Sequence, residues 1–205
     1  MNKLEGLYAI SPETDNSDDL IARVSLVLDN GARILQYRNK SDNTVRRLRQ
    51  ASLLSSLCKS RRVTFIVNDD IPLARAVEAD GVHLGRDDAG IAEARRVLGS
   101  EAVIGVSCYN DIDRARIAHQ AGASYVAFGA VFPSSTKPHA PRAPLELFAR
   151  TRQWGIPAVA IGGITVDNAR SVVEAGADAI AVIGGLFDVA DPAAAARAFA
   201  GLFPA

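Results

Sequence analysis

Short apolar runs recur along the chain and alternate with longer segments in which apolar and polar positions mix. Several runs are apolar at every position, among them Phe65–Val67 and Ala158–Ile161. A short, continuously apolar run is typical of a strand covered on both faces, as in a parallel sheet. We therefore predict strands near residues 6–10, 33–37, 63–67, 81–84, 102–106, 124–128, 157–161 and 179–182.

A glycine follows the end of several predicted helices, directly before the next strand. The pattern occurs in the segments Asn30–Leu35, Ala79–Val82, Ala121–Val126 and Ala175–Ile180. Glycine is favoured just after a helix because that position often needs a positive φ angle. This alternation of helices and strands predicts βα units around a parallel sheet.

One helix is predicted from Asp42 to Cys58. Asp42 is of a residue type that caps helix N-termini, so we expect its carboxylate to cap this helix. An apolar stripe at helical spacing predicts the buried face. The stripe consists of Val45, Leu48, Leu53, Leu54 and Leu57.

Eight strand–helix units in 205 residues leave about 26 residues for each unit, near the lower limit for a (β/α)8 barrel. An open flavodoxin-like sheet needs about five strands and leaves about a third of the chain unexplained. No Pro-, Gly- or Ser-rich linker divides the sequence. The predicted fold class is therefore α/β, a single TIM barrel domain of parallel strands over residues 1–205.

The composition limits the classes of partner that the chain is expected to bind. The chain has 23 basic and 23 acidic residues and no net charge, so it lacks a general positive field that would attract nucleic acid or anionic membranes. No apolar run is long enough to span a membrane, and no signal peptide pattern opens the chain. Two cysteines fit a reducing compartment. We expect a cytoplasmic enzyme of small molecules, and the sequence leaves a homo-oligomer open.

Acidic clusters follow two of the predicted strands. Asp69 and Asp70 come after the third strand, and Asp87 and Asp88 come after the fourth. Because parallel strands end at the same edge of a sheet, these carboxylates are expected side by side. Mg²⁺ usually binds through one or two carboxylates together with substrate phosphates, so the pattern predicts a magnesium site. The alternative is that these residues only cap the helices that follow.

Other strand ends also carry groups suited to anions, and active sites of such barrels lie at this end. The loop after the second strand holds Gln36, Arg38 and Lys40. A loop with hydroxyls and a lysine follows the sixth strand, and glycine pairs follow the seventh and eighth strands. These groups are Ser134, Thr136, Lys137, Gly162, Gly163, Gly184 and Gly185. Glycine pairs at these positions favour a backbone phosphate site.

The remaining reactive side chains have simpler interpretations. Cys108 has no histidine near it in the sequence, so we interpret it as a buried thiol. His83 lies in a predicted strand and is expected inside the barrel with hydrogen-bond partners. His119 is expected on a helix surface, and His139 has no assigned role.

Five segments in register resemble the thiamine phosphate synthase family over nearly the whole chain. They are Gln36–Lys40, Val67–Asp70, Asp80–Asp88, Tyr125–Lys137 and Ala160–Ile164. The resemblance implies joining of 4-amino-5-hydroxymethyl-2-methylpyrimidine diphosphate to 4-methyl-5-(2-hydroxyethyl)thiazole phosphate, or its carboxylated form. The products are thiamine phosphate and pyrophosphate, and the diphosphate departs first in a dissociative, Mg²⁺-assisted reaction.

The resemblance also implies a role for each matching residue. Asp69 and Asp88 hold Mg²⁺, and Gln36 helps to place the pyrimidine. The diphosphate is bound by Arg38, Lys40, Asn68, Ser107 and Lys137, of which all but Asn68 are expected to be catalytic. The thiazole phosphate is bound by Ser134, Thr136, Gly163, Ile183 and Gly184.

Three positions depart from the family pattern. Arg86 stands where Gln is frequent, Tyr109 where His is frequent, and Gly184 where Ser is frequent. Two other functions stay open from the sequence. A thiazole phosphate tautomerase would keep the glycine pairs but need a general base. A non-catalytic sensor of thiamine precursors would bind these ligands without turnover.

Overall fold

The computed structural model describes residues 4–85, 90–133 and 142–204. Its strands close into a barrel in chain order, and every neighbouring pair runs parallel, including the closing pair of the first and last strands. The strands are β1 (Gly6–Ile10), β2 (Ala32–Tyr37), β3 (Thr64–Asn68), β4 (Gly81–Leu84), β5 (Val103–Tyr109), β6 (Tyr125–Phe128), β7 (Ala158–Ile161) and β8 (Ala179–Val182). The predicted TIM barrel is confirmed.

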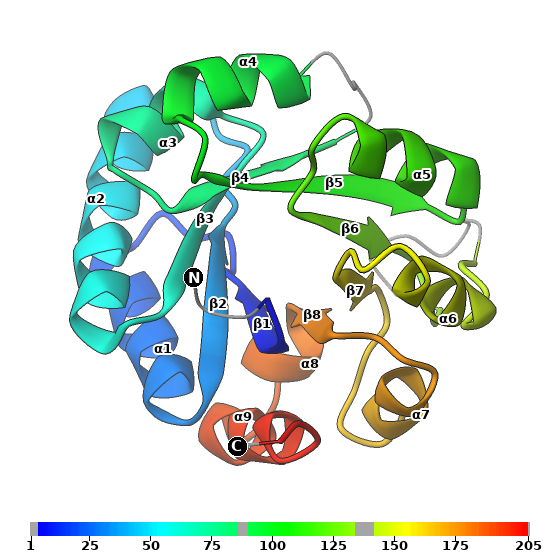
Figure 1. Cartoon of the computed structure of the whole chain (residues 1–205). Coiled ribbons are helices and arrows are strands. Elements are labelled where there is room, and N and C mark those ends of the chain that lie inside the picture. Colours follow the sequence, from blue (N-terminus) through cyan, green and yellow to red (C-terminus); the bar gives the residue numbers. More distant parts are fainter. Residues whose placement is uncertain (1–3, 86–89, 134–141, 205) are drawn as a thin grey trace.

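Helices surround the barrel on its outside (Figure 1). They are α1 (Ser17–Asp29), α2 (Thr44–Arg61), α3 (Ile71–Ala76), α4 (Gly90–Leu98), α5 (Ile112–Gln120), α6 (Glu146–Arg152), α7 (Ala169–Glu174), α8 (Gly184–Phe187) and α9 (Pro192–Ala200). The four-residue helix α8 directly follows β8, so the chain turns into a helix at the carboxyl-terminal end of the barrel.

Apolar residues form two separate clusters because side chains alternate between the two faces of each strand. The inner cluster fills the barrel and includes Ile34, Ile66 and Val159. The outer cluster, with Leu35 and Phe65 among its members, lies between the strands and the helices. Both faces of the sheet are therefore buried, which explains the continuously apolar strand sequences.

The positions that follow helices require glycine for two different physical reasons. Gly31, Gly122 and Gly176 have φ angles of 109°, 90° and 102°, so the expectation of a positive φ is confirmed there. Gly81 lies within β4, and a Cβ atom at this position would overlap the carbonyl oxygen of Val103 on β5. Gly81 is thus required by close strand packing rather than by helix termination.

The predicted cap of α2 is wrong by one residue. The helix begins at Thr44, and its N-cap is Asn43, whose side-chain oxygen accepts a hydrogen bond of 2.9 Å from the Arg46 N–H. Asp42 precedes the cap. Both residue types cap helices well, so the sequence alone does not decide between neighbours.

The predicted apolar stripe of α2 is also mostly wrong. Val45, Leu48 and Leu53 are 78%, 46% and 41% exposed, whereas Leu54 is buried. The buried face instead contains Gln50, Ala51, Leu54, Ser55 and Cys58. Two polar members are satisfied by tertiary partners: Gln50 accepts from the Tyr37 hydroxyl and Ser55 donates to the Val77 carbonyl. These partners lie outside the helix, so helical spacing could not reveal them.

In the described part of the chain, none of the helices has the length and apolar character to cross a membrane.

Candidate active site

The loop after β2 carries the predicted cations Arg38 and Lys40. The Arg38 N–H donates to Ser11 Oγ at 3.0 Å, and the Arg38 guanidinium lies 3.8 Å from the Glu13 carboxylate. Glu13 also accepts a 2.9 Å hydrogen bond from the Lys40 N–H. The loop after β1 therefore orders the loop after β2. Sequence reasoning missed Glu13, which lies near the Arg38 guanidinium and bonds to the Lys40 backbone.

Asp69 lies at the end of β3 in a left-handed conformation, with φ of 59°. Its N–H donates to the His83 carbonyl at 2.8 Å, and its carboxylate accepts a 2.7 Å hydrogen bond from the Asn68 amide. A Cβ atom on Gly85 would lie 3.5 Å from Asp69 Oδ1. The exposed Asp69 carboxylate thus lies beside the end of β4, where the segment towards Asp88 begins. Asp88, like Arg86 and Asp87, lies outside the described residues.

Asp70 has a different environment from Asp69. Its carboxylate accepts from the Leu73 N–H at 2.8 Å as the N-cap of α3, and it pairs with the Arg47 guanidinium. The capping alternative therefore holds for Asp70. Among the predicted acidic residues that the structure describes, Asp69 is the one left facing the barrel end.

The donor set beside Asp69 suits a hard cation. Carboxylate and amide oxygens of Asp69 and Asn68 are the ligand types that Mg²⁺ accepts, with substrate phosphates completing its shell. Within residues 4–85, 90–133 and 142–204 no three His, Cys, Asp or Glu side chains gather into a metal site. The protein part of a metal site here would consist of few ligands, as Mg²⁺ tolerates.

Gln36 and Ser107 are joined by buried side chains inside the barrel. Gln36 Nε2 donates to the Tyr8 hydroxyl at 2.8 Å, and this hydroxyl lies 2.8 Å from that of Tyr125. Tyr125 lies 2.9 Å from His83 Nδ1, and His83 Nε2 lies 2.8 Å from Ser107 Oγ. The expectation of a hydrogen-bonded, interior His83 is confirmed.

Burial keeps the side chains of His83, Tyr8 and Tyr125 neutral. It lowers the pKa of His83 to about 4, opposed by the nearby Asp69 carboxylate, and it raises the pKa of both Tyr8 and Tyr125. Sequence reasoning missed the two tyrosines. Strand alternation could have found them, because Tyr8 and Ile10 share the inward face of β1, as Tyr125 and Ala127 share that of β6.

Arg114 on α5 is another residue that sequence reasoning missed. Its Nε donates to the Ser107 carbonyl at 2.8 Å and its Nη2 to the Gly85 carbonyl at 3.0 Å. Its guanidinium also lies 5.9 Å from the ring centre of Tyr109. Arg114 therefore ties the ends of β4 and β5 together, and Tyr109, one of the departures from the family pattern, covers it.

The other candidate reactive residues have structural surroundings. Cys108 is a buried free thiol, as expected. His119 lies on α5, partly exposed, and its ring stacks on Trp154 at 6.5 Å. His139 lies outside the described residues.

The glycine pairs after β7 and β8 lie against neighbouring loops. Gly162 and Gly163 have φ angles of 98° and 69°, and the Gly163 carbonyl accepts from the Asn168 side chain at 3.0 Å. A Cβ atom on Gly185 would lie 2.3 Å from the Ile164 carbonyl oxygen. The β7 and β8 loops are therefore in contact, and this brings Gly163 close to Ile183 and Gly184 at the start of α8.

The loop after β6 approaches the same place. Phe132 N–H donates to the Gly162 carbonyl at 3.0 Å, and a Cβ atom on Gly163 would lie 2.4 Å from the Pro133 carbonyl oxygen. Pro133 therefore lies directly beside Gly163. The predicted ligands that follow, Ser134, Thr136 and Lys137, lie outside the described residues.

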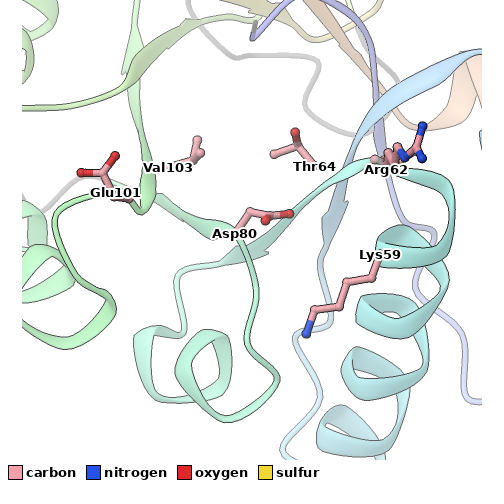
Figure 2. Close-up of a pocket in the computed structure, with 7 residues that line it drawn as sticks. Lys59, Arg62, Thr64, Asp80, Glu101 and Val103 are labelled. Carbon is pink, nitrogen blue, oxygen red and sulfur yellow. The ribbon is translucent and has the colours of Figure 1, made fainter. Parts of the chain in front are cut away.

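Two cavities lie at the opposite, amino-terminal end of the barrel. One of about 260 Å³ is lined by residues at the starts of β3 and β5, including Thr64 and Val103, together with Lys59, Arg62, Asp80 and Glu101 (Figure 2). The second, of about 330 Å³, lies beside Ala32 at the start of β2. Neither is lined by a predicted site residue, so neither alters the assignment of the site to the carboxyl-terminal end.

Comparison with known sequences gives a consistent result. Residues 7–186 match the family model described as thiamine monophosphate synthase. A thiamine-phosphate synthase of Chromobacterium violaceum is 62% identical over 203 residues, which are 99% of this chain and 98% of the relative. The thiamine-phosphate synthase of Methylobacillus flagellatus is 53% identical, with 98% and 96% of the two chains covered.

A solved structure agrees with the sequence relatives. The thiamine phosphate pyrophosphorylase of Pyrococcus furiosus superposes with a TM-score of 0.84 at 33% identity. The match covers 96% of this chain and 94% of that one. The similarity therefore extends over the whole barrel and not only over the segments at its carboxyl-terminal end.

Proposed function

Because the chain belongs to the thiamine monophosphate synthase family, we propose that it joins the pyrimidine diphosphate to the thiazole phosphate and releases pyrophosphate. The supporting observation in the structure is the placement of Gln36, Asn68, Asp69, Ser107 and Gly163 at one end of the barrel. This is the end at which TIM barrels carry their active sites.

The proposed reaction transfers an alkyl group and involves no oxidation or reduction. The bond between the pyrimidine methylene carbon and the diphosphate oxygen breaks, and its electron pair leaves with the diphosphate. The thiazole nitrogen then supplies an electron pair to the resulting cation and forms the new C–N bond. The amino group of the pyrimidine donates electrons to this cation. No protein nucleophile is therefore needed, which agrees with the buried state of Cys108.

Negative charge grows on the departing diphosphate, so groups that bind it more strongly as it leaves accelerate the reaction. Arg38 and Lys40 are the cations for this role in the described residues, and Glu13 holds their loop in place. Asp69 and Asp88 would hold Mg²⁺, which supplies further positive charge to the diphosphate. Ser107 and Asn68 contribute neutral hydrogen-bonding groups.

The thiazole phosphate is assigned to the opposite side of the barrel end. Gly163, Ile183 and Gly184 lie where β7 and β8 loops meet the short helix α8, the position of the common phosphate site in this fold. Ser134 and Thr136 would complete this site from the loop after β6. The glycine at 184 lacks a hydroxyl but keeps its backbone N–H, so phosphate binding survives the departure from the family pattern.

Lys137 is proposed to bind the leaving diphosphate. Removing one preorganised charge contact typically costs about 10²–10³ in rate. We expect a decrease of that order in kcat for Lys137→Ala, with folding unchanged by circular dichroism. A variant within tenfold of the wild type would exclude Lys137 from the mechanism.

The direct test is an assay with the purified protein and both substrates, with and without Mg²⁺, in which thiamine phosphate is detected as its fluorescent oxidation product. Product that requires Mg²⁺ is the expected result. Isomerisation of the thiazole phosphate without coupling would instead identify a tautomerase. Tight binding of both substrates without product would identify a sensor.

We also propose a cellular location and a set of partners for the protein. We place the protein in the cytoplasm, with small-molecule substrates and no nucleic-acid or membrane partner, and its chain as one domain over residues 1–205. Self-association is to be measured by analytical ultracentrifugation.

A further inference from the structure

A continuous chain of buried hydrogen bonds crosses the barrel interior between two proposed substrate-binding residues. We call it the interior chain, and its members are Gln36, Tyr8, Tyr125, His83 and Ser107. We propose that the interior chain fixes which hydrogen-bonding atom Gln36 and Ser107 present to the pyrimidine diphosphate, with Tyr8, Tyr125 and His83 as positioning residues. This inference rests on the proposed function.

The members of the interior chain have little freedom to move. Tyr8 and Tyr125 are 1% and 0% exposed, and Gln36 and His83 are 4% and 8% exposed. The Tyr125 ring stacks on the His83 ring at 5.6 Å and meets the Tyr8 ring edge-on at 6.1 Å. Each tyrosine hydroxyl is therefore held between two partners, and each ring nitrogen of His83 faces one partner.

Gly105 on β5 makes room for Tyr125. A Cβ atom at this position would lie 2.0 Å from Tyr125 Cζ and 2.3 Å from its hydroxyl oxygen. Any side chain at 105 would displace the Tyr125 ring and separate Tyr8 from His83. A glycine inside a strand often marks such a close approach, and here it permits the interior chain to cross the barrel.

The direction of the hydrogen bonds follows from the donor at one end. Gln36 Nε2 can only donate, so the Tyr8 oxygen accepts from it and the Tyr8 proton goes to Tyr125. Tyr125 then donates to His83 Nδ1.

The same donor-to-acceptor order continues across the imidazole ring of His83. A neutral imidazole carries one proton, which in this order lies on Nε2 and is donated to Ser107 Oγ. With Gln36 Nε2 facing Tyr8, the opposite order would give the buried Tyr8 hydroxyl two incoming hydrogen bonds and leave its own proton without an acceptor among the described residues, which is unfavourable.

The two ends of the interior chain consequently present opposite groups. Gln36 has its carbonyl oxygen left as an acceptor, and Ser107 has its hydroxyl proton left as a donor. An acceptor suits the amino group of an aminopyrimidine, and a donor suits a diphosphate oxygen, which can only accept. If the Gln36 amide were turned over and the order reversed, Gln36 would present a donor to the amino group and Ser107 a lone pair to the diphosphate. The interior chain therefore favours a 4-aminopyrimidine over a 4-oxopyrimidine, whose carbonyl needs a donor.

The first test determines which ring nitrogen of His83 carries the proton in the wild-type protein, without any turnover. Nitrogen-15 chemical shifts of histidine distinguish protonation at Nε2 from protonation at Nδ1. The chain has three histidines, and the spectrum of His83→Gln identifies the resonances of His83. A proton on Nε2 is expected, and a proton on Nδ1 would overturn the proposed direction. This readout stands even if the protein proves not to be a synthase.

The second test uses Tyr125→Phe, which keeps the ring but breaks two links of the interior chain. We expect KM for the pyrimidine diphosphate to rise by about tenfold or more, because a buried partner is left unsatisfied. KM for the thiazole phosphate should stay within about twofold, and the preference for amino over oxo pyrimidine inhibitors should fall.

Tyr37→Phe is the matched control, since it removes a buried hydroxyl that bonds to Gln50 outside the barrel interior. Equal changes for both substrates in Tyr125→Phe, or no change, would overturn the positioning role. Thermal unfolding of both variants shows whether they fold, and if Tyr125→Phe does not, the histidine spectrum still decides.

Discussion

Asp69 and Asp70 are adjacent in the sequence, yet their carboxylates have different roles. The left-handed conformation of Asp69, with φ of 59°, turns the chain so that Asp70 caps α3 and pairs with Arg47. Asp69 instead accepts from Asn68 and lies beside Gly85. One backbone angle therefore separates a structural carboxylate from a candidate metal ligand.

This separation predicts different losses for the two residues. Asp69→Asn keeps a residue type that tolerates the left-handed conformation but removes the charge. We expect kcat/KM to fall by about 10²–10³ and half-maximal activity to need more Mg²⁺. Asp70→Ala is the comparison: loss of the cap should lower the free energy of unfolding by about 1–2 kcal/mol while the Mg²⁺ requirement stays. A shifted Mg²⁺ requirement in Asp70→Ala alone would reverse the assignment.

Cys58 predicts how stability changes at alkaline pH. Burial raises the pKa of its thiol to about 12, whereas the unfolded thiol ionises near its ordinary value of about 8.5. Above that value the unfolded chain loses a proton that the folded chain keeps, so stability falls as the pH rises. We expect the unfolding free energy to drop by about 1–2 kcal/mol between pH 8 and 10. Urea melts at several pH values should show a smaller decrease in unfolding free energy with pH for Cys58→Ala than for the wild type. An equal decrease would contradict the assignment to Cys58.

At the scale of the element, α2 shows how tertiary contacts override helical periodicity. Its exposed Val45, Leu48 and Leu53 occupy the face that the sequence pattern predicts to be buried. Its buried face includes Gln50 and Ser55, because Tyr37 and Val77 supply their hydrogen bonds. Helical periodicity found the helix but not its orientation.

The start of α2 gives a prediction for the helix itself. Asn43→Ala removes the side-chain oxygen that accepts from the Arg46 N–H, and such a loss typically costs about 0.5–2 kcal/mol. Asp42→Ala changes the neighbouring residue that precedes the cap and should stay within about 0.5 kcal/mol of the wild type. Chemical denaturation measures both. A larger loss for Asp42→Ala than for Asn43→Ala would return the cap to Asp42.

At the scale of the molecule, closure of the barrel brings the two proposed anion sites to one end. The ends of β2 to β5 supply Arg38, Asn68, Asp69 and Ser107, while the β7 and β8 loops supply Gly163 and its neighbours. The first group lies within residues 38–107, and the second begins at Gly163. Because the two groups are carried by different strands of the barrel, we expect the two sites to respond to mutation independently.

Ligand-induced stabilisation tests this independence. Pyrophosphate with Mg²⁺ should raise the Tm of the wild type by a few degrees, and Asp69→Asn should abolish this rise. Millimolar inorganic phosphate should raise the Tm of both proteins equally. Gly163→Ala, whose Cβ would meet the Pro133 carbonyl, should lose the phosphate effect and keep the pyrophosphate effect. Loss of both effects in either variant would indicate one shared site.

The strands and the parallel barrel can be predicted from the sequence, because apolar runs and turn glycines are local signals. Three features emerge only in the folded barrel: which carboxylate caps a helix, which face of α2 is buried, and the connection of Gln36 to Ser107 through Tyr8, Tyr125 and His83. These features depend on pairs of residues far apart in the chain, such as Tyr8 and Tyr125, which are 117 positions apart. Residues so distant meet only when the barrel closes, and no local pattern records their distance.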